Sequence, residues 1–548
     1  MDLNNRNANN IIDGEDTPRI GKDVLESLTL GMYEDCRFMY REYIQNSADQ
    51  IDKAVNMGLM SKEDGEIHIT IDFAGRKIMV EDNATGIPQD EVVSTLRNVA
   101  HSSKRRGTEK GFRGIGRLGG LGYCTTLRFE TSYSGEPIAS VMTWDGSLFK
   151  KIINNRDEDE EATEVLKRIT NITRQKEDPS KHYFRVIMEG VTSEELLNID
   201  KVREYLSMVA PVDIDSRFAF RNDIRRFMKS NNLSIDTYNV YINGDQIYKP
   251  YTTSIYEDGK DGRKIIDQVS SVKFLLQKDE ENNILYWGWY SNSSFLGQIK
   301  PTNIARGIRL RKENIQIGDE EICKKKFFDK TDDQRFSFYF FGEIHAVGKE
   351  LIPNSRRDYF GETEMCALFE RRIKEDFLKL KELCSDVSKI RSKVKAIKKV
   401  EDTQTKIEEK KKTGYVSKQE EEQDLKMFEK LKSEAEKARR ELENMHQKSS
   451  NPDLKGFFEH AFSSMSKAPQ IPSSNVVQED LFATSVSTKS STPSPTKTKY
   501  RTDKACYSHF SSKEKELISK IYSSIINSIA DERQREALIS KIEEDITK

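Results

Sequence analysis

Histidine and cysteine are scarce in this chain of 548 residues, which contains seven histidines and six cysteines. The cysteines are scattered and form no C-x-x-C pair, and the histidines show no metal-ligand spacing. A structural zinc site is therefore not expected. Scattered thiols are typical of a reducing compartment, so the sequence predicts a cytoplasmic location.

Long apolar runs are missing as well. No stretch of about 20 apolar residues is present, so no membrane span and no membrane partner are expected. Residues 1–16 lack the apolar core of a secretory signal. Neither sign of charge dominates, because 89 Lys and Arg balance 91 Asp and Glu. A net charge of −2 does not indicate a nucleic-acid-binding protein.

Length and composition shifts predict an α+β chain of several domains. We expect a flexible N-terminus, a first α+β domain, a second α+β domain, a helical hairpin or coiled coil, a flexible linker, and a C-terminal helical pair for dimerisation or partner binding. Their expected bounds are 1–21, 22–200, 201–363, 364–448, 449–505 and 506–548.

Strand and helix patterns fill the first two domains. Apolar residues recur at helical spacing from Asp23 to Val55. EIHITIDFAGRKIMVED predicts a hairpin with strands at 66–73 and 76–81. A helix and then a basic loop are expected within 88–110. Further strands are expected at 125–133, 139–146 and 182–190, and in the second domain at 274–277, 284–290 and 336–347, with a hairpin at 239–248.

A heptad seam runs from Ile373 to Ile397 and resumes from Phe428 to Leu442. Gly414 interrupts it, and the run from Ser417 to Glu420 resembles a capping box. The simplest interpretation is an antiparallel hairpin of 364–413 against 417–446, although a parallel dimeric coiled coil also fits. Five prolines among many Ser and Thr predict the linker, in which GFFEHAF (456–462) is a candidate docking motif.

The segment REYIQNSADQ (41–50) places Glu42, Asn46 and Asp49 on one helix face, since residues three and four apart lie together. Asn46 offers an oxygen that suits Mg²⁺. Glu42 lies one turn earlier and is placed to accept a proton from an attacking water. Taken alone, this pattern more often marks the solvent side of a helix.

The segment MVEDNATGIP (79–88) ends an apolar strand with Asp82, where a carboxylate is costly unless it is paired. The exocyclic amine of adenine is a suitable partner. Gly86 lets the backbone approach a base. Taken alone, a sequence of this kind usually forms a turn that binds no ligand.

Seven glycines lie within residues 107–122. This density gives backbone N–H groups access to phosphate oxygens. No GK[ST] closes the run, so it is not a Walker A loop. A helix is expected to begin near Leu121 with its N-terminus toward the phosphates. HSSK (101–104), just before the run, adds Lys104.

In this order and spacing, the three segments resemble the Bergerat-fold GHKL ATPases. These comprise gyrase B-type topoisomerases, heat-shock protein 90 chaperones, histidine kinases and MutL, with MORC proteins as relatives. The family motif ExxxNxxD matches the 41–50 segment, and DxGxG matches Asp82 and Gly86 with Ala84 in place of its first glycine. HSSK with GFRG (111–114) resembles the MutL lid, and IGRLGGLGYC resembles the glycine box of the chaperones.

The resemblance implies a Bergerat-type α/β sandwich over 22–200, followed by an α+β transducer domain. It implies that Glu42 is the general base, that Asn46 is the Mg²⁺ ligand and that Asp82 reads adenine. The other residues implied to bind the nucleotide are Asp49, Gly86, Lys104, Gly111, Phe112, Arg113, Gly114, Gly116 and Gly119. The family usually carries Gly-Thr on a later strand, whereas the strand expected here has Tyr183 and Phe184.

GEIHAVGKELIPNSRRDYF (342–360) resembles the middle-domain segment of the chaperones whose arginine reaches the γ-phosphate. The match assigns that catalytic role to Arg356 and puts Arg357 where the family has an acid. A cation that meets the γ-phosphate only on docking would make closure depend on ATP. A surface arginine pair is an equally good interpretation. RGIRLRKENI (306–315) is interpreted as strand surface rather than as a nucleic-acid contact.

Together these matches imply a slow ATPase that uses ATP and Mg²⁺ to close a lid at about 97–120 and a homodimer, and so acts on a protein client or effector. The alternative is a MutL- or MORC-type clamp in which the same closure traps nucleic acid. The helical arm and the HSSK…GFRG pattern favour the clamp, and the near-neutral charge argues against it. A sensor kinase ranks last because no phosphoacceptor helix adjoins.

Overall fold

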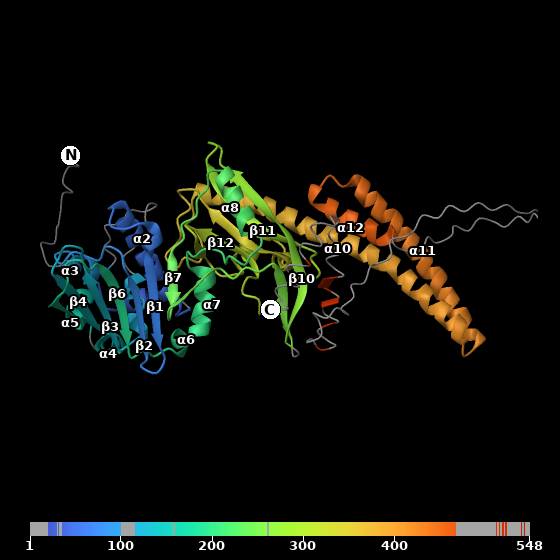
Figure 1. Ribbon diagram of the computed structural model, residues 1–548. Coiled ribbons are helices and arrows are strands. Elements are labelled where there is room, and N and C mark those ends of the chain that lie inside the picture. Colours follow the sequence, from blue (N-terminus) through green and yellow to red (C-terminus); the bar gives the residue numbers. More distant parts are fainter. Residues whose placement is uncertain are drawn as a thin grey trace, which may run out of the picture. The chain divides into compact units, whose positions relative to one another are not determined.

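The structure is a computed structural model that describes residues 20–29, 31, 35–99, 116–155, 157, 159–259 and 262–466, together with eight positions between 511 and 542. The chain divides into one unit over residues 1–469 and a second over residues 470–548. Nearly all described residues belong to the first unit, which Figure 1 shows from blue to orange. The predicted C-terminal helical pair lies largely outside the described residues.

An eight-stranded sheet organises the N-terminal part, with strand order β5-β4-β3-β6-β2-β1-β7-β8 (Figure 1). Neighbouring strands are antiparallel except β1 and β7, which run parallel. The strands are β1 (Glu66–Asp72), β2 (Lys77–Asp82), β3 (Thr126–Ser132), β4 (Ile138–Asp145), β5 (Thr170–Lys176), β6 (Tyr183–Glu189), β7 (Asn239–Ile242) and β8 (Asp245–Gln246).

Two features of this sheet differ from the sequence prediction. The hairpin expected in the second domain forms as β7 and β8, but β7 pairs with β1 and extends the first sheet. Strand β5 was not predicted, because its residues are mostly exposed at the sheet edge and show little apolar alternation. Hairpin periodicity thus identifies strands without saying which sheet they join.

Helices cover one face of the sheet. Ile67, Ile69 and Ile71 of β1 point into a core to which all seven helices of this part contribute. The other face carries ion pairs such as Arg185–Glu81 and is partly exposed. This arrangement is the predicted two-layer α/β sandwich. The helices are α1 (Asp23–Thr29), α2 (Phe38–Asn56), α3 (Val92–Arg97), α4 (Gly146–Asn154), α5 (Ala162–Ile169), α6 (Glu194–Leu197) and α7 (Ile199–Val209).

Two local predictions in this domain were wrong. The helical spacing from Asp23 to Val55 produces two helices, α1 and α2, because a turn in which the Arg37 backbone N–H donates to Asp35 precedes α2. The helix expected near Leu121 is replaced by two 3₁₀ turns, η2 (Gly116–Leu118) and η3 (Leu121–Tyr123), after which the chain enters β3. Repeated glycine disfavours a continuing α-helix.

A second, six-stranded sheet follows, with strand order β13-β12-β14-β11-β10-β9. Both of its faces are covered, which explains the continuous apolar run ILYWGWY of β11. Tyr286 and Tyr290 point toward the core shared with α9 (Ile322–Phe327) and α10 (Glu364–Thr413), whereas Trp287 and Trp289 point toward the core shared with α8 (Arg221–Ser230). The strands are β9 (Ser254–Gly259), β10 (Gly262–Lys278), β11 (Ile284–Ser293), β12 (Gly307–Lys312), β13 (Ile315–Ile317) and β14 (Phe341–Ala346).

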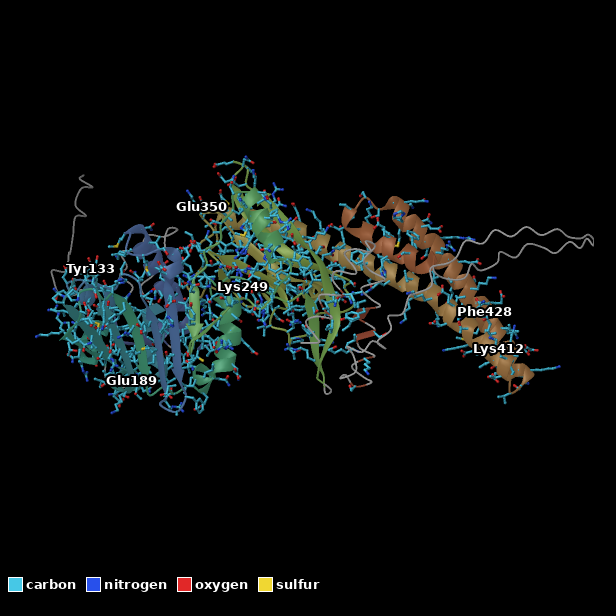
Figure 2. All side chains as sticks on the ribbon, viewed as in Figure 1. Tyr133, Glu189, Lys249, Glu350, Lys412 and Phe428 are labelled. Carbon is cyan, nitrogen blue, oxygen red and sulfur yellow. The ribbon has the colours of Figure 1, made fainter. Side chains whose placement is uncertain are left out.

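Part of the expected strand 336–347 is helical, because the 3₁₀ turn η4 (Gln334–Tyr339) precedes β14. A buried ion cluster ties β12 and β14 to the segment that follows β8. Glu343 lies 2.6 Å from Arg311 Nε and accepts a hydrogen bond from Lys249, which is labelled in Figure 2. Arg311 is fully buried. The basic run 306–315 is therefore largely internal, and the cluster joins the two α+β parts, since Arg311 also donates to the Met208 carbonyl at the end of α7.

The helical arm is the predicted antiparallel hairpin. Helix α11 (Lys418–Lys448) folds back along α10, where Lys410 pairs with Glu420 and Val400 packs against Leu431. Lys412 and Phe428 mark this arm in Figure 2. The first half of the heptad seam packs against the second sheet and against α9, where Phe327 contacts Phe377. Within the expected linker, residues 455–466 form α12, whose Phe458 is buried against the same core.

In the parts of the chain that the structure describes, no helix combines the length and the apolar character needed to cross a membrane.

Candidate nucleotide site

Helix α2 is the scaffold of the site. It covers residues 38–56 and therefore places Glu42, Asn46 and Asp49 on one face, as predicted. Glu42 is buried, and Asn46 and Asp49 are partly exposed. The hydroxyl of Tyr40 donates to the Leu196 carbonyl at 2.7 Å and helps to hold the helix on the domain.

Asp82, at the end of β2, is brought against α2. The hydroxyl of Ser47 donates to Asp82 Oδ2 at 2.7 Å, and the Ala84 N–H donates to Oδ1 at 3.2 Å. Burial raises the pKa of Asp82 to about 7, and these two hydrogen bonds oppose the rise. This carboxyl therefore stabilises the fold fully below its ordinary value of 3.8, and the contribution is lost as the pH rises through about 7.

The turn after Asp82 packs on neighbouring strands. Gly86 has a φ of +67°, and a Cβ there would lie 1.9 Å from the Ser132 carbonyl oxygen. The glycine is thus required by the packing of the turn on β3, whatever its predicted contact with a base. Ala84 is fully buried, so the methyl that replaces the family glycine packs into the core. Phe184 pairs directly with Asp82 across β6 and β2, at the position expected for the departure from the family.

The end of the glycine run lies against α2. A Cβ on Gly116 would come within 2.3 Å of Glu42 Oε2, and one on Gly119 within 3.0 Å of the Phe38 ring. The Gly120 N–H donates to the Tyr43 hydroxyl at 3.0 Å. The backbone of the glycine run is therefore adjacent to Glu42, the candidate base. The remaining predicted phosphate-binding residues, Lys104, Gly111, Phe112, Arg113 and Gly114, lie outside the described residues.

Two arginines flank the other carboxylate oxygen of Glu42. Arg357 Nε lies 3.4 Å from Glu42 Oε1 and Arg41 Nε lies 3.8 Å from it. The side chain of Arg356 is exposed, and its carbonyl accepts a hydrogen bond from Arg41. The structure thus brings Arg357 to Glu42, whereas the contact of Arg356 with a γ-phosphate stays a prediction. Sequence reasoning missed Arg41, Arg357 and Ser47, although the adjacent arginines at 356–357 were a visible signal.

These residues fit a magnesium nucleotide. Helix α2 carries the amide of Asn46 and Glu42, whose oxygen Oε1 has no hydrogen-bond partner. Against the same helix lie the buried acceptor Asp82 and the backbone at Gly116. Mg²⁺ in phosphate sites usually takes one or two protein oxygens and keeps several waters, so a single amide oxygen suffices. Asn46 is the residue on α2 that would hold it.

Replacing Ser47 by alanine tests the electrostatics of Asp82. Loss of the hydroxyl removes a hydrogen bond that lowers the pKa of Asp82, so the ionised form appears only at higher pH. We expect ATP affinity to rise as the pH increases through the Asp82 pKa, and this rise to move to higher pH in Ser47→Ala. The measurement is calorimetric titration between pH 6 and 9, the range around that pKa.

The ionisation of ATP itself affects both proteins equally, so the ratio of the two Kd values is the readout. Ser230→Ala, on the exposed surface of α8, is the matched control. A ratio that stays constant with pH would contradict the assignment.

Replacing Gly116 by alanine tests the contact with Glu42. The added methyl would displace the carboxylate, so we expect kcat for ATP hydrolysis to fall by about 10- to 100-fold with little change in ATP affinity. Gly297→Ala is the control, because nothing lies within 4 Å of its added Cβ. Equal kcat in the two variants would show that Gly116 does not position Glu42.

Comparison with known proteins agrees with this geometry. Residues 38–179 match the family described as histidine kinase-, DNA gyrase B- and HSP90-like ATPases. The chaperone proteins HtpG of Burkholderia lata and Burkholderia ambifaria are each 26% identical to this chain over 144 residues, which cover 23% of both sequences. HtpG of Bordetella parapertussis is 31% identical over 90 residues, which cover 15% of this chain and 14% of that protein.

The chain thus spans less than a quarter of the length of these relatives in the matched stretch. The match includes α2, β2 and the glycine run, the three elements that meet at Glu42 and Asp82. Residues 38–179 are therefore similar to the histidine kinase-, DNA gyrase B- and HSP90-like ATPases.

Proposed function

We propose that this chain binds ATP with Mg²⁺, hydrolyses it slowly to ADP and phosphate, and uses the cycle as a chaperone-like conformational switch. The observation that carries the proposal is the convergence on Glu42. The glycine run approaches this carboxylate at Gly116, and the second α+β part approaches it at Arg357. A nucleotide bound there would touch both parts of the protein.

The proposed roles follow from the positions of the described residues and, for Lys104 and residues 111–114, from the resemblance to the family alone. Asp82 accepts from the adenine amine, and its surrounding turn with Gly86 shapes that end of the pocket. Lys104, Gly111, Phe112, Arg113, Gly114, Gly116 and Gly119 bind the phosphates, with Asp49 on the same face of α2. Mg²⁺, held by Asn46, neutralises phosphate charge when it is bound. Glu42 takes a proton from the attacking water, and Arg356 reaches the γ-phosphate when the two parts close.

Coupling between the parts is supported by their direct contacts. Arg41, next to Glu42, donates to the Arg356 carbonyl across the junction. The Gly318 N–H at the end of β13 donates to the Arg357 carbonyl at 2.8 Å, so the arginine loop is tied to the second sheet. Movement of this sheet would therefore move both arginines. Resemblance to the HtpG chaperones supports a cytoplasmic homodimer that acts on a protein client or effector.

Two substitutions separate binding from hydrolysis. Glu42→Ala removes the base but no proposed ATP contact, so kcat is expected to fall by about 100-fold or more while ATP affinity is kept. Asp82→Asn removes the buried acceptor, so ATP affinity is expected to fall by about 10-fold or more. Phosphate release and calorimetry measure the two quantities. Unchanged turnover in Glu42→Ala would contradict the assignment of Glu42 as the general base.

The clamp for nucleic acid is the second candidate, and the arm favours it. Residues 389–412 of α10 contain ten Lys and Arg against four Asp and Glu, and Lys395, Lys398 and Lys399 are exposed. The burial of Arg309 and Arg311 removes the other basic run as a contact.

Salt dependence decides between the two candidates. If the arm binds duplex DNA through phosphates, log K falls with log salt at a slope of about −0.9 per phosphate contact, and a Lys395→Gln, Lys398→Gln, Lys399→Gln variant has a shallower slope. The chaperone-like switch predicts no such binding with or without a non-hydrolysable ATP analogue. Fluorescence anisotropy over a salt series is the measurement.

A further inference from the structure

Arg357 has an unusual backbone for a long side chain. Its φ is +55°, in the left-handed region that L-residues seldom occupy. The loop holds it there, because the Arg357 N–H donates to the Asn354 carbonyl at 3.2 Å and the Gly318 N–H donates to the Arg357 carbonyl at 2.8 Å. Such strained positions persist when the surrounding structure maintains them, and they are frequent at functional sites.

The side chain of Arg357 is directed at the proposed base. Its Nε lies 3.4 Å from Glu42 Oε1, and the two side chains are each 11% exposed. Oε1 has no hydrogen-bond partner, so the contact is ionic. Arg356, its neighbour in sequence, is exposed instead.

The charged and titratable groups around Glu42, among the described residues, come from three elements. Arg41 and Tyr43 belong to α2, Tyr205 belongs to α7, and Arg357 belongs to the loop between β14 and α10. Burial raises the pKa of Tyr205 to about 12, and the charge of Glu42 adds to the rise. Both tyrosines are therefore neutral near pH 7. Among the described residues, Arg41 and Arg357 are the cations that pair with Glu42.

A carboxylate oxygen that is held against a guanidinium is less available to accept a proton from an attacking water. We infer that Arg357 is a brake: its ion pair with Glu42, made by the docked second α+β part, weakens the base until that loop moves. The inference rests on the proposed ATPase function. Arg357 is a positioning residue in it, because it acts on water only through Glu42.

The loop has room to release the pair. A cleft of about 1040 Å³ adjoins it and is lined by Arg356 and Arg357 together with acidic side chains of the second part. Asp358 and Glu362 are among those acids, so a guanidinium that leaves Glu42 finds other carboxylates nearby. If the second part moves relative to α2, Arg357 can therefore exchange Glu42 for another carboxylate, and its own charge does not remain unpaired.

The test uses the full-length chain with Arg357→Gln, which keeps length and polarity but removes the charge. Turnover under saturating ATP is expected to rise by roughly 2- to 10-fold, because the carboxylate of Glu42 is then no longer held by the guanidinium. Arg357→Lys keeps the cation and should behave like the wild type. Arg439→Gln, an exposed arginine of α11 that pairs with Glu443, is the matched control.

A second measurement does not depend on turnover. A double-mutant cycle of Glu42→Gln and Arg357→Gln on the free energy of unfolding, without nucleotide, should show favourable coupling between the two residues. Coupling together with the faster Arg357→Gln enzyme supports the brake. A slower or unchanged Arg357→Gln enzyme overturns it, as does the absence of coupling.

The two hypotheses fail in different ways. If the wild-type chain does not hydrolyse ATP, the proposed function fails and the brake fails with it. If the wild type is active and Arg357→Gln is not faster, the brake alone fails.

Discussion

A buried carboxylate must be compensated, and in this protein the compensation of Glu42 joins two domains. Glu42 lies in a helix of the first domain, and Arg357 lies in a loop of the second, so their contact exists only when the domains are packed together. The energy of a buried charge pair depends strongly on the distance between the partners, because removing one partner leaves the other charge buried and unpaired. The contact therefore makes the state of the candidate active site depend on the junction.

The same constraint recurs at the other buried acids, with different solutions. Asp82 is compensated by a hydroxyl and a backbone N–H, which are weaker than a cation, so its pKa remains raised. Arg311 and Lys249 lie beside Glu343, and their charges hold its pKa well below the ordinary value despite its burial. A carboxyl that titrates near pH 7 suits ligand binding, whereas an ion pair such as Glu343 with Arg311 suits a permanent joint. The fold thus places an adaptable carboxyl in the site and a rigid one between the sheets.

Local rules predicted the elements that carry the motifs. Spacing of three and four placed Glu42, Asn46 and Asp49 on one helix face, and strand alternation placed Asp82 at the end of β2. These predictions depend on neighbours within one turn or one hairpin. These local rules do not predict how segments that are far apart in the sequence pack against each other. The heptad seam around Phe377 indicated an apolar stripe, but the second sheet and α9 cover its first half.

The sequence by itself determined which residues could perform the chemistry, because residue type and local spacing decide what a side chain can bind and which way a helix presents it. Tertiary structure alone decided that Gly116 and Arg357 meet Glu42, and that β7 joins the first sheet. These contacts join residues far apart in the chain, and their formation depends on the burial of whole faces against each other. No local sequence pattern shows which helix or sheet face packs against which other face.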